Sequence, residues 1–279
     1  MKKITAAFDG LKFSDSTKDY ATHLVKPANA HLVGIFLDDI TYNSYKLSDL
    51  VAKEGITEKT LKQFEEKDKN TRAKAVTDFE KACANAGINY SIHHDKKIAL
   101  RELLHESIYT DLLIIDSKET LTHFEEKIPA RFIRDLLTDV QCPVLLVQQK
   151  YKPIEKIILL YDGEPSSVHA IKMFSYLFPF LKHIKTEVLS VKNIGQSLHL
   201  PDNKLMKGFI KKHYPKASYK VLKGLPELEI ALYLKDQPQD MLVVLGAYRR
   251  GMVSRWFRTS MADILMKELK APLFVAHNR

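Results

Sequence analysis

The sequence contains one pattern twice, and this internal repeat constrains the fold more than any other feature. The pattern opens with KKITAAFDG in the first copy and EKIILLYDG in the second. The matching segments are residues 2–10 with 155–163, 111–115 with 240–244, and 141–148 with 270–277. Such self-similarity indicates two domains of like fold, at residues 1–150 and 151–279. The first copy is longer, and we place its extra residues in the polar segment 40–74.

Within each repeat, short apolar runs alternate with segments of helical spacing. Runs such as Ile4–Phe8 and Val144–Val147 contain no alternating polar residues, which is typical of parallel strands buried on both faces. Near the end of the second repeat, Ser260 and Asp263 form a capping-box pattern at the start of an amphipathic helix. The matching helix of the first repeat has Pro129 in a position that suits a first turn. We predict an α/β fold of two tandem doubly wound parallel-sheet domains, with about five strands each.

The composition is that of an ordinary globular protein, with 45% hydrophobic and 28% charged residues. No apolar run approaches the roughly 18–20 residues that a membrane-spanning helix needs, so we expect no membrane partner. Cys83 and Cys142 cannot build a disulfide framework, and no Cys/His cluster predicts a zinc site. The opening Met-Lys-Lys leads directly into a predicted strand rather than a secretory signal, so we expect a cytoplasmic protein.

The basic charge is concentrated in the second repeat. Residues 1–150 hold 22 basic and 23 acidic side chains, whereas residues 151–279 hold 21 and 11. A basic surface raises the local concentration of phosphates, nucleic acid and acidic membranes. The stretch from Lys207 to Lys223 has six lysines interleaved with Tyr214 and Tyr219. It is either a solvated helix face or a surface for an acidic partner, and without an RNA-binding signature nucleic acid is the weaker expectation.

Ligands of open parallel sheets bind beyond the carboxyl ends of the strands, near the reversal of strand order. The first strand of each repeat ends there in Asp-Gly, at Asp9-Gly10 and Asp162-Gly163. An acidic residue at this point accepts hydrogen bonds from a ribose or base, but Asp and Gly are also ordinary residues of a strand-to-helix turn. The sequence leaves both interpretations open.

The loop after the fourth strand of the second repeat runs from Gly246 to Ser260 and carries a resemblance to a known family. Together with the Asp-Gly turn and APLFV at residues 271–275, it makes the whole chain resemble a tandem universal stress protein. The resemblance implies a Rossmann-like fold of the adenine-nucleotide α-hydrolase type. It also implies, in nucleotide-binding members, a loop of the form Gly-x2-Gly-x9-Gly-Ser/Thr. Glycines there let backbone amides approach phosphates, and the hydroxyl residue begins a helix whose N-terminus favours an anion.

The resemblance assigns site residues to the second repeat. Asp162 and Val191 would line the adenosine side with Gly163 in the same turn, and the phosphate side would consist of Gly246, Arg249, Thr259 and Ser260. Arg249 replaces the family's second glycine, and Thr259 replaces the third. The Arg249 side chain either fills the phosphate space or binds phosphate through its guanidinium group.

The first repeat departs further from the family loop. Its matching residues are Ser117, Thr120, Ala130 and Arg131, and the same loop carries Glu119, Glu125 and Glu126. These carboxylates would repel phosphate. We therefore predict that the first repeat binds no nucleotide.

The remaining motifs predict neither a metal site nor a catalytic residue. His93-His94-Asp95 resembles a metal motif, but adjacent strand residues point to opposite faces, so we predict edge histidines instead. The motifs of serine hydrolases, P-loop proteins, Rossmann dehydrogenases and zincins do not occur in the sequence. The sequence therefore leans away from an enzyme.

Three functions fit these observations. The leading one is a universal stress response protein that acts by interaction or by sensing a small anionic ligand, without catalysis. The first alternative is an adenine-nucleotide switch that binds ATP or a related nucleotide, with Mg²⁺, in the second domain. The second alternative is a nucleic-acid or acidic-surface binder acting through Lys207–Lys223.

The resemblance also implies an assembly. The last strands of the two repeats, Val144–Val147 and Leu273–Ala276, would pair edge to edge, because an apolar edge strand needs a partner. The two domains would then form an intramolecular pseudo-dimer. A homodimer is the other assembly that the sequence leaves open.

Overall fold

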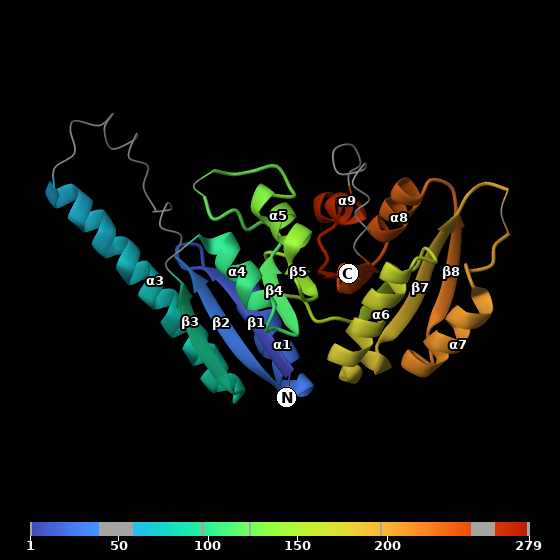
Figure 1. Ribbon diagram of the computed structural model, residues 1–279, viewed down its shortest axis with the longest axis horizontal. Coiled ribbons are helices and arrows are strands. Elements are labelled where there is room, and N and C mark those ends of the chain that lie inside the picture. Colours follow the sequence, from blue (N-terminus) through green and yellow to red (C-terminus); the bar gives the residue numbers. More distant parts are fainter. Residues whose placement is uncertain are drawn as a thin grey trace. The chain divides into compact units, whose positions relative to one another are not determined.

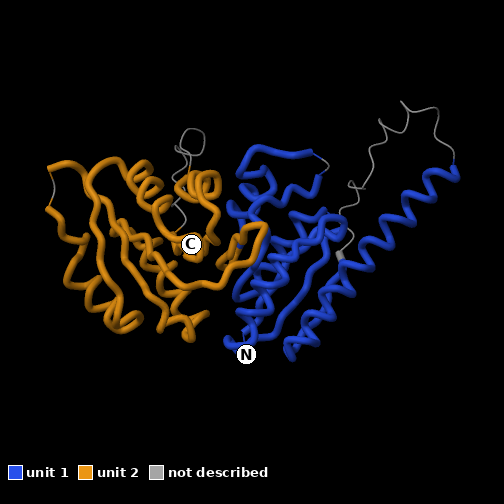
Figure 2. The backbone as a smooth tube through the Cα atoms, turned by 180° about the vertical axis from the view of Figure 1, so that it is seen from behind, with its two compact units in different colours: residues 1–140 blue, residues 141–279 orange. Residues whose placement is uncertain are grey.

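The structure, a computed structural model, describes residues 2–38, 58–95, 98–122, 124–195, 197–246 and 260–277. The chain divides into two compact units, Met1–Val140 and Gln141–Arg279 (Figure 2). In both units strands alternate with helices along the chain (Figure 1). The predicted α/β class is confirmed.

Unit 1 is built around a parallel sheet. Its strands are β1 (Lys2–Asp9), β2 (Ala30–Leu37), β3 (Tyr90–Asp95) and β4 (Leu112–Asp116), in the spatial order β3-β2-β1-β4. The helices described in this unit are α1 (Asp15–Ala28), α3 (Glu58–Ala86), α4 (Ala99–Ser107) and α5 (Arg131–Asp139). Helix α1 packs beside α3, and α4 beside α5. This grouping is what right-handed crossovers produce when the strand order reverses between β1 and β4.

Unit 2 repeats this arrangement. Its own repeat supplies the strands β6 (Lys156–Leu160), β7 (Lys185–Lys192), β8 (Ser218–Lys223), β9 (Met241–Gly246) and β10 (Leu273–Ala276). The helices described here are α6 (Pro165–Leu177), the 3-10 helix η1 (Pro179–His183), α7 (Asn203–His213), α8 (Pro226–Lys235) and α9 (Met261–Glu268). The first five strands of the sheet run in the order β8-β7-β6-β9-β10. Each repeat thus contributes the predicted five strands.

A sixth strand of the unit 2 sheet comes from the first repeat. It is β5 (Val144–Val147), which pairs antiparallel with β10 so that Leu145 lies opposite Phe274. The pairing of the two last strands that the resemblance implied is therefore present. The predicted domain boundary at residue 150 stays a prediction, because β5 matches β10 in sequence yet belongs to the second compact unit.

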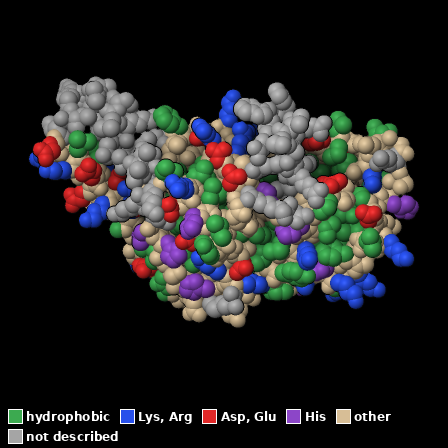
Figure 3. All heavy atoms as spheres, in the orientation of Figure 1, with side chains coloured by type: hydrophobic (Ala, Val, Ile, Leu, Met, Phe, Trp, Pro, Cys, Tyr) green, Lys and Arg blue, Asp and Glu red, His purple; other side chains and the backbone are tan. Residues whose placement is uncertain are grey.

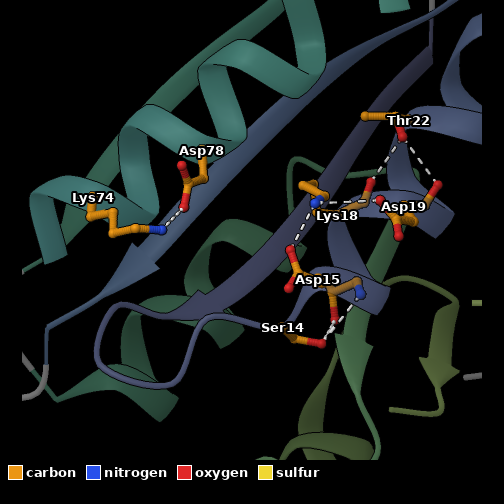
Figure 4. Close-up of polar contacts among 8 residues, drawn as sticks. Ser14, Asp15, Lys18, Asp19, Thr22, Lys74 and Asp78 are labelled. Atoms are coloured by element: carbon orange, nitrogen blue, oxygen red, sulfur yellow. Dashed lines mark hydrogen bonds and ion pairs between the residues drawn. The ribbon is translucent and has the colours of Figure 1, made fainter. Parts of the chain in front are cut away.

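Local sequence explains where the first helices begin. Ser14 is the N-cap of α1, and its hydroxyl accepts a hydrogen bond from the backbone nitrogen of Thr17 at 3.2 Å. In the following turn the Lys18 amine pairs with Asp15 at 2.7 Å and with Asp19 at 3.5 Å (Figure 4).

The prediction for α5 was wrong by two residues. Pro129 precedes its N-cap, Ala130, and so lies outside the first turn.

Helix α3 accounts for much of the extra length of the first repeat, with 29 residues against 11 in α7. Its C-terminal half is anchored by Phe79. A Cβ atom added to Gly34 of β2 would lie 2.6 Å from the Phe79 ring, so the ring packs directly on that glycine. The same ring contacts Phe8 and Phe36, with centroids 5.4 and 5.9 Å away. Among the helices of the described residues, none is long and apolar enough to cross a membrane.

Candidate functional site

The candidate site of unit 2 lies at the carboxyl ends of β6 and β9. The two strands are adjacent and parallel, and the strand order reverses between them. Open α/β sheets bind their ligands at this position. Strand β6 leads into Asp162 and Gly163, and β9 ends at Gly246. Three of the predicted site residues therefore lie at one edge of the sheet.

Asp162 and Gly163 form the turn into α6. The Asp162 Oδ1 atom accepts a hydrogen bond from the backbone nitrogen of Glu164 at 2.9 Å, as in an Asx turn. Gly163 has a φ angle of +94°, a conformation that favours glycine. The turn interpretation of the Asp-Gly pair is thus confirmed. The Asp162 side chain is exposed, and its contact with a ligand stays a prediction.

Gly246 lets the end of β9 approach α6 closely. An added Cβ atom would lie 2.4 Å from the carbonyl carbon of Ser166 and 2.6 Å from the backbone nitrogen of Ser167. Real Cβ atoms essentially never show contacts under 3.0 Å, so a larger residue would push the strand end away from the helix. Ser166 and Ser167 lie in the first turn of α6. Gly246 therefore places the end of β9 against the positive end of a helix dipole.

Ser260 begins α9, as the capping pattern predicted. Its backbone is extended, and its hydroxyl oxygen accepts a hydrogen bond from the backbone nitrogen of Asp263 at 3.1 Å. The residue is half-buried. A serine hydroxyl that accepts one hydrogen bond retains its O–H donor. Ser260 is therefore able to cap the helix and to donate a hydrogen bond to an anion at the same time.

The chain between β7 and α7 covers the turn at Gly163. A Cβ atom added to Gly163 would lie 2.7 Å from the Pro201 Cβ atom, so the proline packs directly on the glycine. The Tyr161 hydroxyl donates a hydrogen bond to the Pro201 carbonyl at 3.1 Å, and Leu200 is buried. Burial, together with two nearby aspartates, raises the pKa of Tyr161 above its usual range, so the donor stays protonated. Pro201 therefore occupies the space directly over Gly163, one of the residues that the resemblance assigns to the adenosine side.

The other predicted site residues of unit 2 are Val191, Arg249 and Thr259. Val191 is half-buried on β7, where it lies opposite Leu222 of β8. Arg249 and Thr259 lie outside the described residues. The two interpretations of Arg249, filling the phosphate space or binding phosphate, both stay predictions.

The matching edge of unit 1 is filled by charged side chains. Asp9, at the end of β1, is only 1% exposed, and its Oδ1 atom accepts a hydrogen bond from the backbone nitrogen of Leu11 at 2.8 Å. Arg72 of α3 lies over Gly10, where an added Cβ atom would be 3.0 Å from the Arg72 Cγ atom. The Arg72 Nε atom pairs with the Asp38 carboxylate at 2.8 Å. Gly10 is thus covered from α3, as Gly163 is covered by Pro201.

Glu119 makes this edge of unit 1 more acidic. It follows β4, is 8% exposed, and its Oε1 atom accepts hydrogen bonds from the backbone nitrogens of Thr120 and Leu121, both at 2.9 Å. Burial and the nearby charge of Asp9 raise the pKa of Glu119 to about 7. The loop also carries Glu125, which is exposed. Asp9 and Glu119 therefore lie near enough for the charge of Asp9 to raise the pKa of Glu119.

Sequence reasoning missed Arg72 and Pro201. Arg72 lies in the polar segment that we predicted only to lengthen the first repeat, and Pro201 lies in a loop without a repeat match. Both residues lie between the second strand of their repeat and the strand after it. Their place in the sequence was the one feature that could have pointed to them. The segment after the second strand starts at the carboxyl edge of the sheet, so it is able to fold back over the turn that follows the first strand.

The histidines of β3 lie on opposite faces of the strand, as predicted. The His93 Nδ1 atom is 2.9 Å from the Glu106 carboxylate of α4, whereas the His94 ring stacks on Phe36 with centroids 5.8 Å apart. Within the described ranges, no three His, Cys, Asp or Glu side chains form a group that could hold a metal ion. Cys83 is fully buried and packs as a small apolar residue, and this burial raises the pKa of its thiol to about 12.

The fold and this edge define a duplicated, doubly wound α/β protein with its candidate site at a reversal of strand order. The sequence matches no protein-family model and no curated protein. Solved structures do resemble it. A universal stress protein from Archaeoglobus fulgidus DSM 4304 is 14% identical with a TM-score of 0.71, over 99% of this chain and 98% of that one. A protein of unknown function from Pseudomonas aeruginosa PAO1 is 14% identical with a TM-score of 0.62, over 99% and 92%.

A third solved structure of this shape is the cytoplasmic domain of a prokaryotic cation chloride cotransporter. It is 11% identical, with a TM-score of 0.52, and the alignment spans 98% of this chain and 94% of that one. The chain therefore has the fold of tandem universal stress proteins, which confirms the fold that the resemblance implied. Because proteins of different names share this fold, function has to be argued from the site.

Proposed function

We propose that the protein is a non-catalytic universal stress response protein that senses a small anionic ligand, and that unit 2 alone binds this ligand. The observation that carries the proposal is the contrast between the two sheet edges. Unit 1 buries Asp9 and Glu119 at its edge. The position that matches Glu119 in the second repeat is Tyr248, so the second repeat lacks this carboxylate. Asp162 matches Asp9, so an anion meets one carboxyl group fewer at these matched positions of unit 2.

Two helix starts favour an anion at the unit 2 edge. Gly246 lies against the first turn of α6, and Ser260 begins α9, which follows β9 and therefore starts at the carboxyl side of the sheet. Helix N-termini offer backbone amides and a partial positive charge to a phosphate or carboxylate. Residues 151–279 also carry ten more basic than acidic side chains, which raises the local anion concentration.

An adenine-nucleotide switch with Mg²⁺ is the second candidate, favoured by Ser260 at the hydroxyl position of the family loop. The phosphate end of a nucleotide fits the helix starts. The adenosine end does not fit as the chain stands, because Pro201 packs against Gly163 and Leu200 beside it is buried. A nucleotide would have to displace these residues. We therefore expect tighter binding of a compact phosphorylated anion than of ATP.

Calorimetric titration of the full chain with inorganic phosphate, AMP and ATP, with and without Mg²⁺, tests the proposal. Ser260→Ala removes the hydroxyl donor and should weaken binding by roughly tenfold, the value of one hydrogen bond to a charged group. Ser14→Ala is the matched control, because it removes the N-cap hydroxyl of α1 in unit 1. Each variant should lose about 1 kcal/mol of unfolding free energy from its lost cap.

The proposal requires that Ser260→Ala weakens binding and Ser14→Ala does not. Equal affinity of the two variants would contradict it. If ATP with Mg²⁺ binds more tightly than phosphate, and Ser260→Ala weakens that binding, the second candidate replaces the first.

The intramolecular pseudo-dimer also belongs to the proposal. The antiparallel pairing of β5 with β10 joins strands from the two repeats and supports it. A homodimer and the cytoplasmic location stay predictions.

A further inference from the structure

The segment 165–225 carries the basic surplus of the protein. It contains eleven lysines, no arginine and two acidic residues, so its net charge of +9 equals that of the whole chain. One of the two acids, Glu187, already interacts with Lys156 at 3.6 Å and accepts a hydrogen bond from the Tyr233 hydroxyl at 2.7 Å. The lysines of this segment therefore meet little opposing charge from within it.

Four of these lysines form one face of α7. Met206 and Ile210 are buried against the rest of unit 2, which leaves the opposite face exposed. We call this face, made of Lys204, Lys207, Lys211 and Lys212, the α7 lysine face. None of the four forms an ion pair with another described residue. Lysines gather at the lower right of Figure 3, the region in which Figure 1 places α7.

The α7 lysine face is open and electrostatically unfavourable by itself. Gly208 lies in its middle, and apart from its chain neighbours and the backbone of α7 itself, no described atom lies within 4 Å of a Cβ atom added there. Like charges three and four residues apart on a helix repel one another and reduce helix stability. Such a face is stabilised when an anion covers it. A solvated helix with no partner more often carries acidic and basic residues in mixture.

Exposed aromatic rings lie near α7 at two places, one beside the α7 lysine face and one beside the last residue of the helix. Tyr219 of β8 is 38% exposed, and the Lys207 amine lies 5.7 Å from its ring centroid. Tyr176 of α6 is 52% exposed, and its ring centroid lies 5.6 Å from that of His213, the last residue of α7. Tyr214, which the sequence grouped with Tyr219, is buried and takes no part.

The basic surface continues beyond α7. Burial, and then the charges of Lys182 and Lys172, lower the pKa of His213, so both lysines lie near the end of α7. The His213 Nδ1 atom is 2.6 Å from the Ser175 hydroxyl, which fixes the ring beside Tyr176. Lys172 of α6 and Lys182 of η1 therefore add positive charge in the neighbourhood of His213.

We propose that the α7 lysine face, with Tyr176 and Tyr219, binds single-stranded nucleic acid without sequence preference. Lysines act as point charges that contact phosphates, and exposed rings stack on bases of any kind. This surface uses residues separate from the ligand edge of unit 2, so it stands independently of the function proposed above. An anionic membrane would instead require apolar side chains among the lysines, and Leu205 is the one exposed aliphatic residue of α7.

Fluorescence anisotropy with short labelled oligo-dT and oligo-U strands tests the proposal on the full chain. If the four lysines neutralise four phosphates, the slope of log affinity against log salt should be about −3 for a single strand. Affinity should then fall by about 50-fold between about 50 and 200 mM salt. The double variant Lys207→Gln/Lys211→Gln should reduce the magnitude of this slope by about 1.4.

A matched control distinguishes binding at the α7 lysine face from a general effect of the net charge of the protein. Lys59→Gln/Lys69→Gln removes the same charge from two exposed positions of α3 in unit 1, and should leave the slope unchanged. The variant Tyr176→Leu/Tyr219→Leu should weaken binding at least about fivefold with an unchanged slope, because stacking involves no phosphate contact. All six positions are exposed, so these substitutions should leave the fold intact.

Three results would overturn the proposal. One is no binding of either strand at about 50 mM salt, where phosphate contacts are strong. Another is an equal effect of the α3 control and the α7 variant. The third is tighter binding to phosphatidylglycerol-containing vesicles in co-sedimentation than to the oligonucleotides, which would assign the surface to a membrane.

Discussion

Substitution by alanine should change the unfolding free energy in opposite directions at Gly246 and Gly208, because the two glycines have different surroundings. A Cβ atom on Gly246 would overlap the backbone of Ser166 and Ser167 in α6. Gly246→Ala should therefore lower the unfolding free energy by about 1–3 kcal/mol and move the end of β9 away from the helix start. Chemical denaturation of the full chain measures this loss. A ligand held at this edge should also bind more weakly to the variant.

Gly208→Ala is the control for that prediction. Gly208 lies inside α7 with open space where a Cβ atom would be. Alanine there should stabilise the helix by about 0.5–1 kcal/mol, because glycine loses more backbone freedom on folding. If both variants changed stability in the same direction, the close packing of β9 on α6 would be refuted.

The raised pKa of Glu119 predicts that the unfolding free energy depends on pH. Its pKa is raised from the ordinary 4.5 to about 7 by burial and by the charge of Asp9, with Lys12 acting in the opposite direction. Between these two pH values the folded chain binds more protons at this site than the unfolded chain. Its contribution to unfolding free energy therefore falls as the pH rises from about 4.5 to 7, by up to about 3 kcal/mol, and changes little above that.

Glu119→Gln should remove this pH dependence. The amide oxygen is able to keep the hydrogen bonds from Thr120 and Leu121, while the charge beside Asp9 is lost. The variant should gain stability over the natural chain at about pH 8 and little at about pH 5. Denaturant unfolding at both pH values measures the difference. Glu125→Gln, at an exposed position of the same loop, should show no such change, and equal curves for the two variants would contradict the buried pair.

Single-residue features were predictable from the sequence where neighbours along the chain decide them. Ser260 caps α9 because Asp263 is three residues away, and Asp162 forms its turn with Glu164. Arg72 and Pro201 were not predictable in this way. Each covers its glycine because of tertiary folding. The local sequence does not indicate which turn a long segment between two strands will contact.

At the scale of elements, β5 decides where the second domain begins. It pairs antiparallel with β10 and covers the edge of that strand. A chain of residues 141–279 keeps β5 on the edge of β10, so it should self-associate less than a chain that lacks this strand. A chain of residues 151–279 lacks β5, exposes the apolar edge of β10 and should self-associate.

Sedimentation velocity of the two chains tests the role of β5. They differ only in residues 141–150, the segment that contains β5. Monomers in both cases would show that β10 needs no cover, and would favour the predicted boundary at residue 150.

The buried strands were predictable because apolar runs without alternation fit only a sheet covered on both faces. Strand β5, for example, has the bounds Val144–Val147 that the sequence predicted. The first residue of α5 was not predictable, because proline is acceptable both within the first turn of a helix and just before its N-cap. The length of α3 was predictable only as a surplus of polar residues. Its position depends on the packing of Phe79 against Gly34.

At the scale of the whole molecule, the two repeats have the same order of strands and a different net charge. Residues 1–150 are nearly neutral and place Glu119 beside Asp9, whereas residues 151–279 hold the entire basic surplus. This difference in charge supports the proposal that the two copies have different roles. In the proposed function, unit 1 has a supporting role and unit 2 binds the ligand.

Hydrogen exchange of the full chain, with and without saturating inorganic phosphate or AMP, is the most direct test of that division. A ligand bound only in unit 2 should slow exchange at the β6–α6 turn, residues 161–167, and at the start of α9, residues 260–264. Exchange at residues 9–14 and 116–121 of unit 1 should stay unchanged. Protection of the unit 1 segments, or of both units equally, would contradict the assignment of the site to unit 2.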